Sequence, residues 1–250
     1  MTETPNDHYS YEHYRSRDVA EGFNALRFSG PIGTLIQETQ QALLLRALAP
    51  IEGRRVLDVG TGTGRAALAF AKAGAVVTGV DASAEMLAVA TRQAAELGVN
   101  ATFKVGDAHH LPFADQEFQA AVSLRVVMHT PDWRQCVSEL CRVSSERVVV
   151  DFPAFGSFAT IESLVRRSRK VFGAKVEAYR TLREASVRAV IDAGGFRVIE
   201  THRQFVLPIN FHKLFNSLAV TTGVEGTLAS VGLLRALGSP VTFVAERVAR

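Results

Sequence analysis

The sequence predicts an α/β fold, a doubly wound and mainly parallel sheet with helices on both faces. Short apolar runs that suit buried strands alternate with helical patterns along most of the 250 residues. A glycine-rich turn, GTGTG at residues 60–64, separates the first run from a strong helix former. Carboxylates follow the first three runs, at the edge where a doubly wound sheet binds ligands. Residues 1–250 are expected to form one domain with insertions.

Composition narrows the class of protein. Hydrophobic residues make up 47% of the chain, and a formal net charge of +3 does not call for a nucleic-acid partner. The N-terminus lacks the charged start and apolar core of a signal peptide, and no run approaches the roughly 20 apolar residues that span a bilayer. We expect a cytoplasmic protein, and the sequence leaves its oligomeric state unknown. The two cysteines, Cys136 and Cys141, are expected to be buried hydrophobes without a disulfide.

The N-terminal part, about residues 10–49, is predicted to form two helices after a polar start. One begins near Asp18, and the other covers 34–48 with apolar residues at helical spacing. Gly30-Pro31 is expected to separate them.

The glycine turn itself predicts a cofactor cradle. It joins the apolar run Val56, Leu57 and Val59, a predicted strand, to a helix at 66–72. Glycine lets the backbone take positive φ and approach a ligand closely. Free N–H groups at the helix start favour accepting groups. Gly62, Gly64 and Ala67 also satisfy a dinucleotide fingerprint, so this turn by itself leaves NAD open.

Asp58 changes that balance, because an acid two positions before Gly60 repels a pyrophosphate and suits a cationic ligand. The resulting D-x-G-x-G-x-G pattern resembles the first motif of the class I S-adenosylmethionine-dependent methyltransferases. The resemblance implies S-adenosyl-L-methionine as cofactor and S-adenosyl-L-homocysteine as product. It implies that Asp58 and the turn residues Gly60, Thr61, Gly62 and Gly64 bind this cofactor.

Two further strand ends fit the same ligand. The strand at 75–80 ends in Asp81 and Ala82, where an acid accepts hydrogen bonds from ribose hydroxyls. The strand at 101–105 is followed by Asp107 and Ala108, which the resemblance places at the adenine. Further residues that the resemblance assigns to the cofactor are Met86 near the adenine, with a plain core role as alternative, Tyr14 at the carboxylate, with helix packing as alternative, and Leu124 and Arg125.

The loop after the fourth strand, at 123–133, faces the transferable methyl group in that fold. It lacks a D/N-P-P-Y/F motif and an acid of the magnesium-dependent catechol type. Arg125 supplies a fixed cation, and His129 is either a general base or substrate contact or an anchor of the loop. The segment resembles V-L-x-H-x-x-D of small-molecule methyltransferases, the type 11, quinone-biosynthesis-like branch. No metal site is expected at His109 and His110, because neighbours in a loop point apart.

Ser83 and Asp132 are each expected to cap the helix that follows them. The last part of the chain departs from the plan of the family that it resembles. A basic amphipathic helix at 161–172 is either a solvated face over a core stripe or a contact with an anionic substrate or membrane surface. Insertions at about 155–182 and 206–238 are predicted to be helical lids over an apolar acceptor pocket.

The motif resemblance covers about residues 54–152. It implies a Rossmann-like sheet of seven strands in the order 3-2-1-4-5-7-6, with strand 7 antiparallel. The implied activity is in-line methyl transfer to an oxygen, nitrogen or carbon nucleophile of a small, partly apolar molecule. Three alternatives stay open: lipid or quinone methylation at a membrane surface, an NAD-dependent oxidoreductase, and a non-catalytic cofactor-binding protein.

Overall fold

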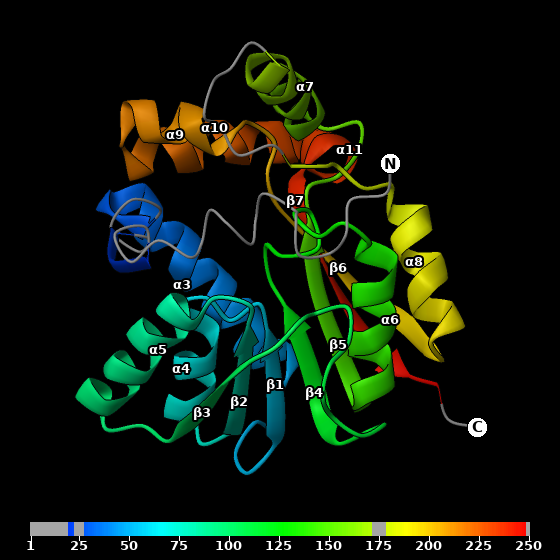
Figure 1. Cartoon of the computed structure of the whole chain (residues 1–250). Helices are drawn as coiled ribbons and strands as arrows, with labels where there is room; N and C mark the ends of the chain where they lie inside the picture. The colour runs from blue at the N-terminus through cyan, green and yellow to red at the C-terminus, as the bar shows by residue number, and fades with distance from the viewer. Residues whose placement is uncertain (1–19, 23–27, 172–178, 249–250) are drawn as a thin grey trace.

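The computed structural model describes residues 20–22, 28–171 and 179–248. Within these ranges, seven strands form one sheet in the order β3-β2-β1-β4-β5-β7-β6 (Figure 1). β7 runs antiparallel to β5 and β6, and the other neighbouring strands are parallel. The predicted fold class and strand order are confirmed. The strands are β1 (Arg55–Val59), β2 (Val76–Asp81), β3 (Ala101–Val105), β4 (Phe118–Ser123), β5 (Ser144–Phe152), β6 (Phe196–Phe205) and β7 (Ser239–Arg247).

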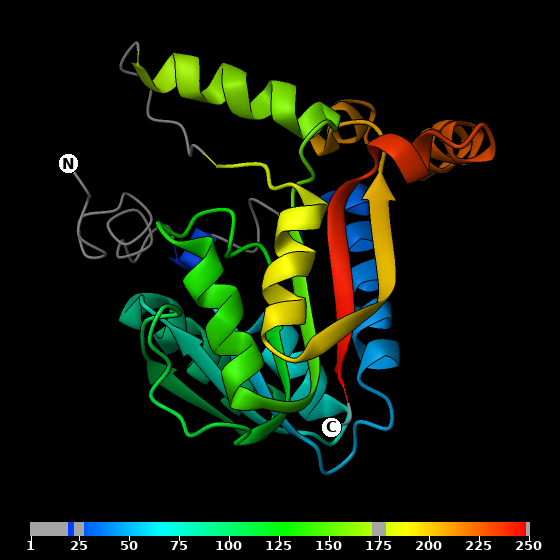
Figure 2. The same cartoon turned by 90° about the vertical axis from the view of Figure 1, so that its right-hand side faces the viewer.

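Helices cover both faces and the carboxyl edge of this sheet (Figures 1 and 2). They are α3 (Gly30–Ala47), α4 (Arg65–Lys72), α5 (Ala84–Leu97), α6 (Trp133–Val143), α7 (Phe158–Val171), α8 (Glu184–Ala193), α9 (Ile209–Phe215), α10 (Leu218–Ser230) and α11 (Leu233–Leu237). The predicted caps are present, because Ser83 accepts from the backbone N–H of Met86 and Asp132 accepts from those of Arg134 and Gln135.

One face of the sheet is covered by α3 and α4. Leu44 of α3 and Phe70 of α4 share a buried core with Val56, Val149 and Val244 of the sheet. α5 lies beside α4, since a Cβ on Gly64 would come within 2.9 Å of the Ala90 Cβ of α5. The glycine turn is therefore held between the sheet and two helices.

The start of α3 corrects one prediction. The helix after the Gly30-Pro31 break was expected to begin at residue 34, but the break lies at Ser29 and α3 begins at Gly30, with Pro31 in its first turn. Proline fits there because the N–H that it lacks would have no partner within the helix. Ile32 and Ile36 then pack against Phe205 at the end of β6. Most of the predicted N-terminal cap before residue 28 lies outside the described residues.

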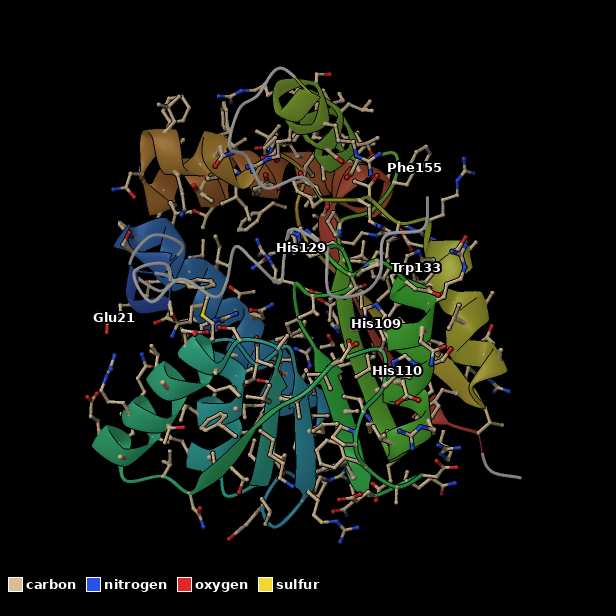
Figure 3. All side chains as sticks on the ribbon, in the orientation of Figure 1. Glu21, His109, His110, His129, Trp133 and Phe155 are labelled. Carbon is tan, nitrogen blue, oxygen red and sulfur yellow. The ribbon has the colours of Figure 1, made fainter. Side chains whose placement is uncertain are left out.

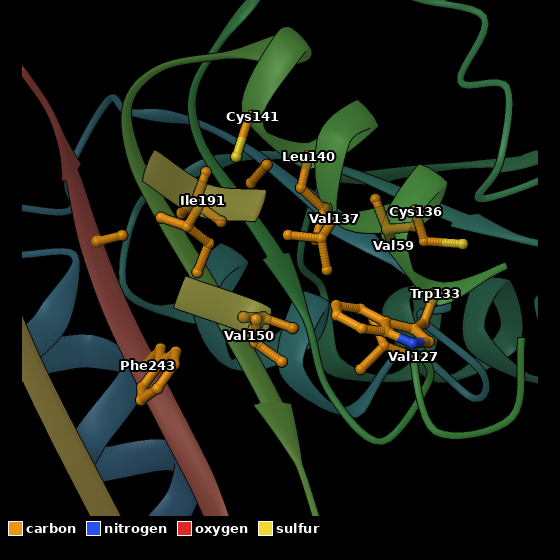
Figure 4. Close-up of a cluster of buried hydrophobic side chains, with 14 of the residues drawn as sticks. Val59, Val127, Trp133, Cys136, Val137, Leu140, Cys141, Val150, Ile191 and Phe243 are labelled. Carbon is orange, nitrogen blue, oxygen red and sulfur yellow. The ribbon is translucent and has the colours of Figure 1, made fainter. Parts of the chain in front are cut away.

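The opposite face is covered by α6 and α8. Trp133 begins α6 (Figure 3), and the helix buries its apolar side against β4 and β5. Figure 4 shows Val137, Leu140 and Ile191 in this cluster. Both cysteines are buried and free, as predicted, and lie in the same cluster. Burial raises the pKa of the Cys141 thiol to about 12, which keeps it protonated and inert.

The two predicted insertions form helices at the carboxyl edge of the sheet. α7 follows β5, whereas α9, α10 and α11 lie between β6 and β7, and Figures 1 and 2 show them together above the strand ends. Ile161 and Leu164 of α7 are 60% and 59% exposed. The interpretation of α7 as a solvated face over a core stripe is therefore wrong, because its apolar stripe faces solvent. Across the described residues, no helix is both long enough and apolar enough to cross a membrane.

Candidate functional site

The glycine turn lies at the point where the strand order reverses, between β1 and β4. Ligands bind at this point in open α/β sheets, outside the carboxyl ends of the strands. The backbone N–H groups of Gly60 and Thr61 donate to Val80 O, at 2.7 and 3.0 Å, and so hold the turn to β2. Gly60, Gly62 and Gly64 have φ of +71°, +55° and +82°, which glycine adopts without strain.

Asp58 organises the turn from below. Its side chain is 2% exposed, and its Oδ2 accepts hydrogen bonds from Thr61 Oγ1 at 2.7 Å and from Ala67 N at 3.2 Å. The Thr61 hydroxyl therefore points inward, toward Asp58, so Thr61 presents its backbone at the edge of the sheet. Burial raises the pKa of the Asp58 carboxyl to about 6, since the charged form is desolvated. A cation bound beside the turn would stabilise that charged form.

Asp81 ties the turn to the end of β2. Its Oδ2 accepts from Gly62 N at 2.8 Å, and its Oδ1 accepts from Ser83 N at 2.9 Å. Burial raises its pKa, and these backbone N–H groups oppose the rise. A carboxylate has lone pairs for further acceptance after two such bonds. Asp81 therefore keeps acceptor capacity at the end of β2, beside the glycine turn.

Asp107 lies at the end of β3, half-buried, in contact with His109. Its Oδ1 accepts from His109 N at 2.9 Å and lies 2.7 Å from His109 Nδ1. The contact with Asp107 raises the pKa of His109, whereas the Asp132 N–H, 3.3 Å from Nε2, favours the neutral ring. His109 is buried and links β3 to the start of α6, while His110 is exposed. Figure 3 shows both beside α6.

The loop after β4 packs directly on the glycine turn. A Cβ on Gly60 would lie 2.2 Å from Val126 Cγ2, so the two loops are too close for any side chain at residue 60. Arg125 has φ of +61°, which is uncommon for a residue with a side chain and costs of order 1–3 kcal/mol. His129 is 7% exposed, and its N–H donates to Val126 O at 2.8 Å. Figure 3 places His129 between the sheet and the lid helices.

Asp151, near the end of β5, holds this loop and was missed by the sequence reasoning. It is 1% exposed, and its Oδ1 accepts a short hydrogen bond from Arg125 N. Burial raises its pKa, and the charges of Arg125 and Arg65 oppose the rise. The signal was present, because Asp151 lies near a strand end as the three predicted acids do.

Arg65 and Gln40 belong to the same cluster as Asp151. Their positions in the sequence gave no indication of this, because neither lies at a strand end. Gln40 Nε2 lies 3.4 Å from Asp151 Oδ2, and its Oε1 accepts a short hydrogen bond from Arg65. The Arg65 guanidinium also lies over the Phe28 ring, 4.2 Å from its centroid. Burial and the charge of Arg125 lower the pKa of Arg65 to about 10. Two cations, Arg65 and Arg125, therefore lie near the edge close to the glycine turn.

The remaining predicted site residues fall into different places. Leu124 is buried in the core with α3 and α4, and Ala108 packs against the core under α6. Met86 is 2% exposed in a small cluster with Ala20 and Val89, which is the core role left open as its alternative. Ala82 is exposed at the end of β2. Tyr14 lies outside the described residues.

The described part of the chain contains no group of three or more His, Cys, Asp or Glu residues arranged to hold a metal ion.

Comparison with known proteins identifies the part of the chain that carries this edge. Residues 56–146 match the family model described as a methyltransferase domain. This part of the chain, about a third of its length, is therefore similar to a methyltransferase domain. The match begins at β1 and includes the glycine turn, the ends of β2 and β3, and the loop after β4. It ends before Asp151 and before the lid helices.

The curated relatives match between about a third and a half of the chain. Demethylmenaquinone methyltransferase of Renibacterium salmoninarum is 35% identical over 124 residues, 48% of this chain and 51% of the relative. An uncharacterized methyltransferase of Bacillus subtilis, YcgJ, is 43% identical over 90 residues, 36% of each chain. This chain spans about half the length of the first curated relatives it matches.

A solved structure resembles the whole fold. Magnesium protoporphyrin IX methyltransferase from Synechocystis PCC 6803 superposes with a TM-score of 0.68 and 18% identity, and the match covers 96% of this chain and 98% of that one. Likeness at this identity concerns the fold.

Proposed function

We propose that this protein transfers a methyl group from S-adenosylmethionine to a small, partly apolar molecule. The observation that carries the proposal is the glycine turn held by Asp58 and Asp81, with Asp107 following the next strand, β3, at the same edge of the sheet. A sulfonium and an ammonium group suit buried acid, and ribose hydroxyls suit Asp81. The Synechocystis neighbour, solved with S-adenosylhomocysteine and with S-adenosylmethionine bound, supports the choice of cofactor.

The residues present fit this cofactor. A Cβ on Gly62 would meet nothing within 4 Å, so the backbone of the turn is open on the side that a ligand approaches. Gly60, Gly62 and Gly64 would support the cofactor, Asp81 its ribose, and Asp107 with the Ala108 backbone its adenine. When bound, the cofactor supplies an electrophilic methyl group on a sulfonium leaving group.

This chain's own residues would position the acceptor and exclude water. Positioning contributes most where the leaving group is already good. We assign to His129 the removal of a proton from the acceptor where the nucleophile carries one. Arg125, whose backbone N–H donates to Asp151, would supply a fixed cation to this edge of the sheet. The acceptor's nucleophile is an oxygen, nitrogen or carbon atom.

Calorimetric titration of the purified protein with S-adenosylmethionine and S-adenosylhomocysteine tests the choice of cofactor. We expect micromolar binding of both and no binding of NADH. The alternative of an NAD-dependent oxidoreductase predicts the reverse preference, and binding of NADH alone would overturn the proposal. A screen of acceptors by mass spectrometry then separates an enzyme from a non-catalytic cofactor-binding protein.

Substitution of His129 tests the assignment of the base. His129→Ala should lower the methyl-transfer rate by about 10²–10⁴, the usual contribution of a general base. Affinity for S-adenosylmethionine should stay within a factor of about two, since the Val126 O bond uses the backbone N–H and survives the change.

The exposed His110 provides a matched control. His110→Ala should keep the wild-type rate. Unchanged turnover in His129→Ala would remove His129 as a base. A lowered melting temperature with an unchanged rate would assign it to loop anchoring instead.

A further inference from the structure

The lid helices expose apolar side chains on a scale that the rest of the described surface does not. Of the sixteen large hydrophobic residues exposed in the described ranges, eleven lie in segments 155–165 and 211–231. Soluble surfaces rarely gather large apolar side chains in one region without a binding role. We call these residues the apolar lid surface: Phe155, Phe158, Ile161, Leu164, Val165, Phe211, Leu214, Phe215, Leu218, Val220 and Val231.

Both segments lie at one end of the molecule. Figures 1 and 2 show α7, α9, α10 and α11 together at the carboxyl edge of the sheet, away from α4 and α5. α10 turns its one acid inward, where Glu225 accepts from Val206 N at 2.7 Å and from Leu207 N at 3.0 Å and contacts His212 at 2.9 Å. The exposed residues of α10 carry no charge and include Leu218 and Val220. The acid of α10 is therefore used inside the lid, and its exposed side is uncharged.

The same segments concentrate positive charge. Residues 155–171 and 206–238 contain six lysines and arginines against two acids, a formal charge of +4. The whole chain has 28 basic and 25 acidic residues, so the remainder has 22 and 23 and a charge of −1. One of the two lid acids, Glu162, bonds Arg166 at 2.7 Å. Arg167 and Arg169 are exposed on α7 beside the apolar stripe.

We propose that the apolar lid surface docks on a bilayer that contains anionic phospholipid. An amphipathic helix with large apolar residues and flanking arginines binds such a surface through both apolar burial and charge. A symmetric contact with a second copy would bring two +4 surfaces together, and like charges across an interface are costly. Anionic lipid satisfies both features of the surface, and the contact is peripheral. This inference stands apart from methyl transfer, because docking requires no turnover.

Co-sedimentation of the full chain with vesicles tests the docking. We expect binding to an equal mixture of phosphatidylglycerol and phosphatidylcholine, and little binding to phosphatidylcholine alone. Arg167→Gln with Arg169→Gln should weaken binding by about 25-fold, since each neutralised residue near an anionic surface loses about fivefold. Ile161→Ser with Leu164→Ser should weaken binding by about tenfold or more.

Matched controls lie elsewhere on the surface. Val76 and Val105 are 60% and 61% exposed, as Ile161 and Leu164 are, but belong to β2 and β3. Val76→Ser with Val105→Ser, and Arg92→Gln with Arg197→Gln, should leave vesicle binding unchanged. All four substituted pairs are surface positions, and thermal unfolding should confirm that each variant folds.

Three results would overturn the proposal. The wild type could bind both kinds of vesicle equally or not at all. The control pairs could lose as much binding as the lid pairs. Sedimentation velocity could show a dimer that Ile161→Ser with Leu164→Ser dissociates while vesicles bind nothing, which would assign the surface to contact between copies.

Discussion

Asp81→Ala should abolish measurable binding of S-adenosylmethionine, with a loss of affinity of about 10²-fold or more. Each hydrogen bond to a charged group contributes about 1.5–3 kcal/mol, and the carboxylate would lose two ribose contacts at once. It would also release Gly62 N and Ser83 N, which it holds at 2.8 and 2.9 Å, and so loosen the turn. Calorimetric titration measures the loss.

Two further variants separate the role of Asp81 in binding from a general effect. Asp81→Asn keeps the shape but replaces one accepting oxygen by an NH₂ group, so an intermediate affinity is expected. Asp192, exposed on α8, serves as control, and Asp192→Ala should bind as the wild type does. Affinity of Asp81→Ala within about threefold of the wild type would refute the ribose assignment.

Alanine at Gly60 and at Gly62 should have different effects, although both residues have positive φ. At Gly60 the new Cβ would lie 2.2 Å from Val126 Cγ2, and the stiff valine has little freedom to move away. We expect Gly60→Ala to lose about 2–5 kcal/mol of stability, about 1–2 from the left-handed backbone and the rest from overpacking. At Gly62 the Cβ meets nothing within 4 Å. Gly62→Ala should lose about 1–2 kcal/mol and stay folded.

Cofactor affinity should be lowered by the Gly62 substitution, although that substitution costs less stability than the one at Gly60. Folded Gly62→Ala should bind S-adenosylmethionine at least tenfold more weakly. The alanine methyl group would occupy the space in which the cofactor approaches the backbone of the turn. Gly53 has φ of +72° and open space, and it precedes β1 at the other end of that strand. Gly53→Ala should show the backbone cost alone, with unchanged binding.

Chemical unfolding and calorimetry of the three variants give both quantities. Adding Val126→Ala to Gly60→Ala should recover part of the lost stability. No recovery would show that the contact between the two loops is not the cause. Full cofactor affinity in Gly62→Ala would place the cofactor away from the turn.

The sequence predicted the central half of the molecule well, because the signals there are local. Apolar runs of strand length, a glycine turn and acids at strand ends lie within about 100 residues, between Arg54 and Phe152. Each follows from backbone geometry and burial within a few residues. Ser83 and Asp132 were predicted as caps for the same reason, since a cap acts on N–H groups two or three residues away.

Predictions failed where distant contacts decide. The second N-terminal helix was predicted to start at residue 34, but it starts at Gly30, where Ile32 and Ile36 pack on Phe205. One of the two interpretations of α7 placed its apolar stripe in the core, yet other helices already cover the sheet faces that could bury it. Ile161 and Leu164 stay exposed. Periodicity reports that a helix has an apolar side and does not say what covers it.

The sequence by itself determined the fold class, the strand order through its family resemblance, and a glycine turn with acids at the ends of the first three strands. Only the tertiary structure decided that Gln40 and Arg65 converge on Asp151, which holds the Arg125 backbone in its left-handed conformation. It also brought the exposed apolar residues of two segments to one end of the molecule. The physical reason is range: strand, turn and cap signals act over a few residues, whereas Gln40 and Asp151 are 111 positions apart and meet through packing alone.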